Sequence, residues 1–213
     1  MNGYQQQFLR LAIELGALRF GSFTLKSGRQ SPYFFNAGVF STGRAVAALG
    51  RFYAETVLAT DLEFDMLFGP AYKGIPLVAV TAAALADHHD LDTAFAYNRK
   101  EAKSHGEGGA IVGAPLAGRV IILDDVITAG TAVRQAVELI RTAGAEVAAV
   151  VLALDRQERG AGPRSAVEEL GAELGTPVAS IASLGDLIAL LGSDSHLREH
   201  LPAMEAYRQD YGV

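Results

Sequence analysis

The stretch 119–131 constrains the fold of this chain more than any other part of the sequence. Residues 120–123 read Val-Ile-Ile-Leu, a short β-branched run that is typical of a strand buried on both faces of a parallel sheet. Asp124 and Asp125 follow, then a loop of small residues, and from Thr131 the apolar spacing becomes helical. A strand that leads through such a loop into a helix predicts an open α/β sheet, in which ligands bind at the carboxyl ends of the strands.

The loop after the two acids has the composition of a phosphate site. Thr128, Gly130 and Thr131 bring hydroxyls and free backbone N–H groups to a helix N-terminus, which favours an anion. No Gly-Lys-Ser/Thr follows, so the loop is not of the Walker type. The carboxylates would repel phosphate, but they accept hydrogen bonds from hydroxyls and support hydrated Mg²⁺. The pattern therefore indicates a ribose phosphate; the alternative is a solvated turn with two surface acids.

Size and composition narrow the class of protein. The chain has 213 residues, half of them hydrophobic, which predicts one domain over residues 1–213. A net charge of −6 argues against a general nucleic-acid-binding surface, and the lack of cysteine excludes a disulfide framework, a cysteine nucleophile and a thiolate metal site. No secretory leader pattern and no membrane-spanning apolar run is found, so we expect a cytoplasmic protein without membrane contacts.

Short extended runs punctuated by glycine and proline occupy residues 17–36, after an amphipathic helix at the N-terminus. They predict a small β subdomain, here called the hood, that lies over a larger sheet. The hood carries Lys26 and two adjacent aromatics, Phe34 and Phe35. Neighbours on a strand point to opposite faces, so one should face the core while the other could stack on a flat ring. The pattern does not say which, and burial of both is the alternative.

A second strand–loop–helix unit is predicted over residues 65–85, after a helix from Thr42 to about residue 59. Its loop contains Tyr72 and Lys73, so that an ammonium and helix N–H groups could meet a diphosphate. A solvated lysine is the alternative reading.

Residues 98–109, here called the lid segment, concentrate positive charge in an acidic chain. Arg99, Lys100, Lys103 and His105 are followed by glycines at 106, 108 and 109. This composition favours a mobile lid that closes over an anionic substrate and excludes water. A solvated loop is the alternative.

The C-terminal part continues the alternation of strands and helices. A buried strand over 147–154 is followed by Asp155 and Arg156. At the carboxyl end of the strand Arg156 could pair with a carboxylate or a base carbonyl, or else belong to a salt-bridged surface turn. A helix over 165–174, a strand over 178–181 and helices over 184–191 and 196–211 follow. His196 and His200 would share a face of the last helix, but a metal site there lacks a third ligand.

Over residues 25–160 the chain resembles the type I phosphoribosyltransferases, and among them the bacterial orotate phosphoribosyltransferases. The motifs Lys-Ser-Gly-Arg, Ser-Pro-Tyr-Phe-Phe-Asn, Gly-Pro-Ala-Tyr-Lys-Gly, Asn-Arg-Lys-Glu-Ala-Lys and Asp-Arg-Gln-Glu-Arg-Gly occur in the family's order, around the acidic stretch. Ser104 departs from close relatives, which often carry an acid there. The resemblance implies a central, mostly parallel sheet flanked by helices, with an N-terminal β hood and a mobile lid loop.

The implied reaction is the Mg²⁺-dependent transfer of ribose 5-phosphate from phosphoribosyl diphosphate to orotate, which yields orotidine 5′-monophosphate and diphosphate in pyrimidine biosynthesis. The resemblance also implies a homodimer, in which Arg99, Lys103 and His105 reach the neighbouring subunit's site while Lys100 serves its own. Two rivals share the fold. A purine phosphoribosyltransferase is disfavoured by the lysine-rich lid and Arg156, and a non-catalytic regulator is disfavoured by the lid and the acidic charge.

By resemblance, the site residues divide into three groups. The catalytic group is Lys26, Lys103, His105, Asp124 and Asp125, of which the two acids hold the ribose hydroxyls and the outer shell of Mg²⁺. The orotate group is Phe34 or Phe35 for stacking, with Thr128 and Arg156 on the polar edge. The residues for phosphoribosyl diphosphate are Lys26, Tyr72 and Lys73 (with a cis Ala71–Tyr72 peptide), Arg99, Lys100, Lys103, His105, Asp124, Asp125, and the loop Val126, Ile127, Thr128, Ala129, Gly130, Thr131 and Ala132.

Overall fold

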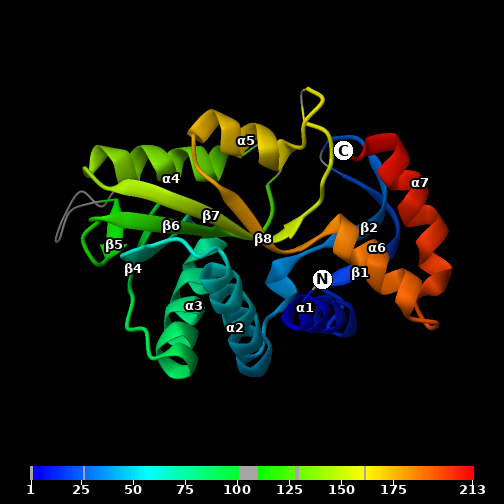
Figure 1. Cartoon of the computed structure of the whole chain (residues 1–213), viewed down its shortest axis with the longest axis horizontal. Coiled ribbons are helices and arrows are strands. Elements are labelled where there is room, and N and C mark those ends of the chain that lie inside the picture. The colour runs from blue at the N-terminus through cyan, green and yellow to red at the C-terminus, as the bar shows by residue number, and fades with distance from the viewer. Residues whose placement is uncertain (1, 26, 101–109, 128–129, 161) are drawn as a thin grey trace.

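The computed structural model describes residues 2–25, 27–100, 110–127, 130–160 and 162–213. A six-stranded sheet runs through the molecule with helices on both faces, and a separate two-stranded sheet is built from the N-terminal hood (Figure 1). The predicted α/β architecture is therefore confirmed.

The central sheet has the strand order β5-β4-β3-β6-β7-β8. Its strands are parallel except for β5, which pairs antiparallel with β4. β6, the strand predicted from the acidic stretch, lies near the centre with its apolar residues fully buried. The bounds are β3 Met66–Gly69, β4 Ala94–Asn98, β5 Ile111–Gly113, β6 Arg119–Asp124, β7 Glu146–Asp155 and β8 Val178–Ser183.

The two faces of β6 belong to two different cores. Ile121 and Leu123 pack in the larger cluster with the helices on one face, whereas Val120 and Ile122 pack in a second cluster on the other. This division follows from the alternation of side chains along a strand. The first face is covered by α1 Gly3–Glu14, α2 Gly43–Ala59 and α3 Gly74–His89, and the second by α4 Thr131–Thr142 and α5 Ala166–Leu174.

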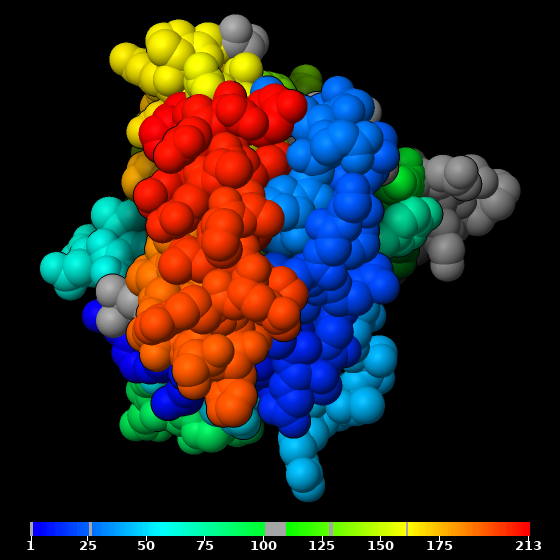
Figure 2. All heavy atoms as spheres, turned by 90° about the vertical axis from the view of Figure 1, so that its right-hand side faces the viewer, coloured from blue at the N-terminus to red at the C-terminus, as the bar shows by residue number. Residues whose placement is uncertain are grey.

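The hood is an antiparallel pair, β1 Leu18–Thr24 and β2 Gln30–Phe35, with a register shift between Phe20 and Phe23. A short 3-10 helix, Ala37–Val39, leads from it to α2. Two C-terminal helices, α6 Leu184–Ser193 and α7 Leu201–Tyr211, complete the chain. Figure 2 shows α7 (red) lying along the blue N-terminal part of the chain, and α7 contacts β2 of the hood.

Three sequence predictions need correction. β5 was not anticipated, because three residues are too few to display a strand period. The predicted helix 196–211 begins only at the 3-10 turn Arg198–His200, and α7 starts beside Pro202, which favours the first turn of a helix. His196 and His200 therefore do not share a helix face; the ring of His200 stacks on Phe20 with centroids 4.1 Å apart.

Among the helices of the described residues, none is both long enough and apolar enough to cross a membrane.

Candidate active site

The carboxyl ends of β3, β6 and β7 meet the hood around a cavity of about 770 Å³. These strands are neighbours in the sheet, so loops that are far apart in the sequence open into one space. Of the predicted site residues, the cavity brings together Phe34, Phe35, Lys73, Asp125, Val126, Ile127, Gly130 and Arg156.

The acidic pair at the end of β6 is buried and held by hydrogen bonds. Asp124 is 9% exposed and Asp125 4%, so the alternative of a solvated surface turn is wrong. The backbone N–H of Asp125 donates to Oδ1 of Asp124 at 2.9 Å, and the hydroxyl of Tyr53 donates to the carbonyl of Asp124 at 2.7 Å. Burial, together with the charge of Asp125, raises the pKa of Asp124 to about 6.

Lys73 immediately precedes α3 and lies directly beside this pair. Its ammonium donates to Oδ2 of Asp125, joining the loops that follow β3 and β6. The loop before it is tight, because a Cβ on Gly69 would lie 2.2 Å from the carbonyl oxygen of Gly74. The predicted cis peptide between Ala71 and Tyr72 is confirmed.

The aromatic ring of Tyr72 lies beside the first residues of the lid segment. It is 66% exposed, and the ammonium of Lys100 lies 4.7 Å above its ring, within the range of a cation–π contact. The backbone N–H of Ala71 donates to the side chain of Asn98 at 2.9 Å. The loop after β3 and the first residues of the lid segment are thus in contact.

The phosphate loop of the sequence prediction leads into α4 as expected. Gly130 precedes the helix with a φ of 68°, a left-handed conformation that favours glycine, and α4 starts at Thr131, with Ala132 next. The first backbone N–H groups of such a helix lack partners within it. Arg134, which sequence reasoning missed, also lines the cavity, and its Nε and Nη2 donate to Glu173 at 2.8 and 2.7 Å.

Arg156 also lines the cavity, directly after β7. Its side chain is only 12% exposed, so it is not a surface residue, although it does form the ion pair that the alternative reading expected. Its Nε donates to Oε1 of Glu158 at 2.7 Å, and its guanidinium lies 4.2 Å above the ring of Tyr33. Sequence reasoning missed Tyr33 and Tyr53, because their contacts join distant segments, and it missed Glu158, which also bonds to the distant Tyr207.

The two adjacent phenylalanines of the hood face different surroundings, as the alternation on a strand predicts. Phe35 is 6% exposed and packs edge-on against Phe8 in the core. Phe34 is partly exposed and packs beside Phe23, with the guanidinium of Arg19 5.9 Å above its ring. Phe34 is therefore the better placed of the two to meet a ligand.

Several predicted site residues lie outside the described part of the chain: Lys26, Lys103, His105, Thr128 and Ala129. Arg99 is described, and its backbone N–H donates to the carbonyl of Ala110 at 2.7 Å, across the lid segment.

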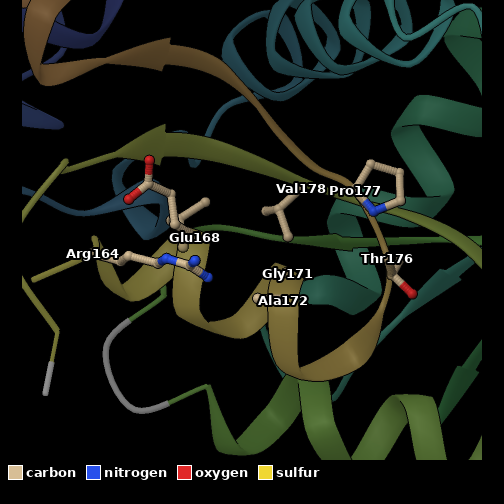
Figure 3. Close-up of a pocket in the computed structure, with 8 residues that line it drawn as sticks. Arg164, Glu168, Gly171, Ala172, Thr176, Pro177 and Val178 are labelled. Atoms are coloured by element: carbon tan, nitrogen blue, oxygen red, sulfur yellow. The ribbon is translucent and has the colours of Figure 1, made fainter. Parts of the chain in front are cut away.

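A smaller pocket of about 400 Å³ lies between α5 and the start of β8 (Figure 3). Arg164 and Glu168 stand at one end and Thr176 at the other. None of the predicted site residues lines it, and Val167 alone belongs to both pockets. The larger cavity is therefore the candidate active site.

Mg²⁺ prefers oxygen ligands, and the acidic pair at the end of β6 supplies them. Within the described residues no group of three or more acids, histidines or cysteines is arranged around a metal position. The acidic pair offers hard oxygen ligands, and Mg²⁺ is often bound through one or two carboxylates together with substrate phosphates and water. Asp124 and Asp125 therefore fit a metal that arrives with its substrate.

Comparisons with known proteins agree with this geometry. Residues 39–170 match the phosphoribosyl transferase domain family. Over 100% of both chains, the protein is 60% identical to an orotate phosphoribosyltransferase of Pseudomonas aeruginosa and 62% identical to one of Thioalkalivibrio sulfidiphilus.

Solved structures give the same result. A Francisella tularensis orotate phosphoribosyltransferase matches with a TM-score of 0.87 and 38% identity, over 97% of this chain and 100% of that one. A Mycobacterium tuberculosis orotate phosphoribosyltransferase in complex with 5-phospho-α-D-ribosyl 1-diphosphate matches with a TM-score of 0.63 and 25% identity, over 86% and 98%. The chain therefore belongs to the phosphoribosyltransferase family and, within it, to the orotate phosphoribosyltransferases.

Proposed function

We propose that the cavity binds phosphoribosyl diphosphate at its Asp125 end and orotate at its Arg156 end, and that transfer takes place between them. The observation that carries this proposal is that one cavity of about 770 Å³ contains Lys73, Asp125, Gly130 and Arg156. Oxygen acceptors, an ammonium and a helix N-terminus follow β6 and β3, and the guanidinium of Arg156 follows β7. This distribution suits a sugar phosphate beside an anionic ring.

In this proposal the diphosphate substrate is held from three sides. The loop from Val126 to Ala132 and the N-terminus of α4 take the 5-phosphate. Asp124 and Asp125 accept the ribose hydroxyls. The cations and donors for the diphosphate are Lys26, Tyr72, Lys73 and Lys100. The exposed position of Lys73, 58% of its side chain, supports its transfer from Asp125 to an incoming phosphate.

Mg²⁺ is the proposed cofactor, carried mainly by the substrate, with Asp124 and Asp125 in its outer shell. When bound, it would neutralise charge on the diphosphate leaving group. The protein's part is to keep both carboxylates in place, and the hydrogen bonds from Tyr53 and from the backbone of Asp125 support that role.

Orotate would lie between the hood and the end of β7. Arg156 and Thr128 would hold its polar edge, since a guanidinium matches a carboxylate in shape and charge. Phe34 or Phe35 would stack on the ring; the more exposed ring of Phe34 supports Phe34.

The chemistry requires no covalent intermediate with the enzyme. The bond at the anomeric carbon breaks with oxocarbenium character, so positioning and stabilisation of the departing diphosphate lower the barrier. Lys103 and His105 would bind the leaving group as the lid segment closes, and we propose that they and Arg99 do so in the neighbouring subunit of a homodimer. A cytoplasmic location completes the proposal and accords with the cysteine-free sequence.

The experiment that tests the proposal supplies phosphoribosyl diphosphate and Mg²⁺ with orotate, hypoxanthine or adenine in turn. We expect orotate to be consumed only when the diphosphate and the metal are both present. Arg156→Ala should raise the KM for orotate without raising that for phosphoribosyl diphosphate. Turnover of a purine base, with orotate inert, would contradict the assignment of the base site.

A further inference from the structure

An acid, Glu158, lies in the cavity wall at the end that would receive an anionic base. Its side chain is 13% exposed, and both of its carboxylate oxygens have partners. Oε1 accepts from Nε of Arg156 and from the hydroxyl of Tyr207, both at 2.7 Å. Oε2 accepts from Nη1 of Arg29 at 3.2 Å. One carboxylate thus joins the loop after β7, the hood and α7.

The guanidinium of Arg156 is fixed by the same three segments. Its Nη2 donates to Oγ of Ser31 on β2 at 3.1 Å and to the hydroxyl of Tyr207 on α7 at 3.4 Å. The ring of Tyr33, also on β2, lies beneath it at 4.2 Å. These contacts restrict the rotamers of the Arg156 side chain before any ligand binds. The entropy cost of ordering that side chain on ligand binding is therefore smaller.

The backbone of this loop is also tied to the end of α7 and to the residues that follow it. The N–H of Arg159 donates to the carbonyl of Tyr211 at 2.8 Å, and the N–H of Val213 donates to the carbonyl of Gln157 at 3.1 Å. The side chain of Gln157 accepts from the N–H of Gly185 at 2.8 Å. The loop therefore depends on residues that lie beyond the motifs of residues 25–160.

The side chains that pair around Glu158 carry more positive than negative charge, which favours an anionic ligand. Arg29 and Arg156 share the single carboxylate of Glu158. The neighbouring acid, Asp155, accepts instead from the backbone N–H of Gln157 at 2.8 Å, and burial raises its pKa. Within this network two guanidiniums share one carboxylate, an arrangement that suits a ligand with a carboxylate of its own.

We infer that Glu158 is a positioning residue for the base: it holds the guanidinium of Arg156 against the hood, and Tyr207 of α7 locks the pair. The inference rests on the proposed role of Arg156 in orotate binding. It assigns a function to the C-terminal helix, which would support the base site from the side remote from the diphosphate.

The test compares the steady-state kinetics of four variants. Glu158→Gln keeps the shape and one acceptor but removes the charge that orients Arg156. We expect it to raise the KM for orotate about tenfold and to change the KM for phosphoribosyl diphosphate less than about twofold. Glu63→Gln is the control, since Glu63 also pairs with an arginine, Arg119, but at the amino end of β6, away from the cavity. It should leave both KM values unchanged.

The other two variants, Arg156→Ala and the double variant Arg156→Ala/Glu158→Gln, separate positioning from a merely structural role. If Glu158 acts through Arg156, the double variant should have the same KM for orotate as Arg156→Ala alone. Multiplicative effects would overturn the inference, and so would a lower KM in Glu158→Gln, which would mean that Glu158 competes with orotate. An unchanged KM for orotate in Arg156→Ala would instead remove Arg156 from the base site, and the proposed function would fail at that point.

Tyr207→Phe gives a second test that keeps every charge. It deletes only the hydroxyl that donates to Glu158, and should raise the KM for orotate by about two- to fivefold. If Glu158→Gln does not fold, Tyr207→Phe alone tests the inference. An unchanged KM for orotate in Tyr207→Phe would contradict the coupling between α7 and the base site.

Discussion

The ammonium of Lys73 pairs with the carboxylate of Asp125 across the ends of β3 and β6, the two central strands of the sheet. The pair is asymmetric, because the lysine side chain is 58% exposed and the aspartate side chain only 6%. An exposed lysine can exchange its partner at little cost, whereas the buried acid cannot leave its place. Phosphate binding should therefore move the lysine and leave the aspartate fixed.

Replacing Lys73 by alanine tests this arrangement. The variant should raise the KM for phosphoribosyl diphosphate about tenfold or more, because a cation near the diphosphate is lost, while the KM for orotate changes less than about threefold. Steady-state kinetics with each substrate varied in turn measure both values. An unchanged KM for phosphoribosyl diphosphate would place the lysine outside the diphosphate site.

The stability of the ligand-free protein should depend on pH through Asp124. Burial and the charge of Asp125 raise its pKa from 3.8 to about 6, so the folded state holds a proton that the unfolded state releases between these values. Stability contributed by this group is thus present at low pH and is lost as the pH rises through about 6. Asp124→Asn cannot titrate, and its advantage over the wild type should grow between pH 4 and pH 7 by up to about 3 kcal/mol.

Urea unfolding of both proteins at the two pH values, in the presence of a metal chelator, measures that difference. Asparagine keeps an oxygen that can accept from the backbone of residue 125, so the remaining effects should be similar at both pH values. An equal difference between variant and wild type at pH 4 and pH 7 would show that Asp124 is ionised with an ordinary pKa.

The two phenylalanines of the hood should respond differently to truncation. Phe35→Ala removes a core ring that packs against Phe8, and should cost about 3–5 kcal/mol of stability. Phe34→Ala should cost less, and should instead raise the KM for orotate severalfold, because a partly exposed ring at the cavity is lost. Denaturant unfolding and kinetics on both variants test this; a normal KM for orotate in Phe34→Ala would exclude stacking by that ring.

Tyr33 offers a stabilising substitution. Its hydroxyl is buried and has no hydrogen-bond partner among the residues that the structure describes. Tyr33→Phe keeps the ring under Arg156 and should raise the free energy of unfolding by about 1 kcal/mol. The matched control is Tyr53→Phe, which removes the hydroxyl that donates to Asp124 and should lower stability by about 1–2 kcal/mol. Equal losses in both variants would mean that Tyr33 has a hidden partner.

Sharing of the lid between subunits can be tested by mixing two inactive variants, Lys103→Ala and Asp124→Asn/Asp125→Asn. After joint unfolding and refolding in equal amounts, about half of the dimers are mixed, and one of the two sites in each combines an intact lid with an intact loop. Activity should return to roughly a quarter of the wild-type value if each lid serves its neighbour. If mixed dimers form without any recovery, each lid serves its own subunit.

Local patterns in the sequence were sufficient to predict most helices and strands. The β-branched run before Asp124, the change to helical spacing at Thr131 and the cap at Thr42 are all confirmed, because they depend on neighbours within about four residues along the chain. β5 was missed, since its three residues become a strand only through pairing with β4. The late start of α7 was missed because a helical pattern across 196–211 concealed a local break before Pro202.

The sequence by itself determined the fold class and the kinds of residue at the site, because a buried strand, a phosphate loop and a pair of adjacent acids each consist of consecutive residues. Only the tertiary structure decided that Asp125 pairs with Lys73, that Tyr53 supports Asp124, and that Glu158 joins Arg156 to Tyr207. These contacts link residues that are up to 71 positions apart, as in the bond from Tyr53 to Asp124. The order of the strands in the sheet brings these residues together. That order depends on side-chain packing across the whole molecule, and it cannot be read from the periodicity of any single segment.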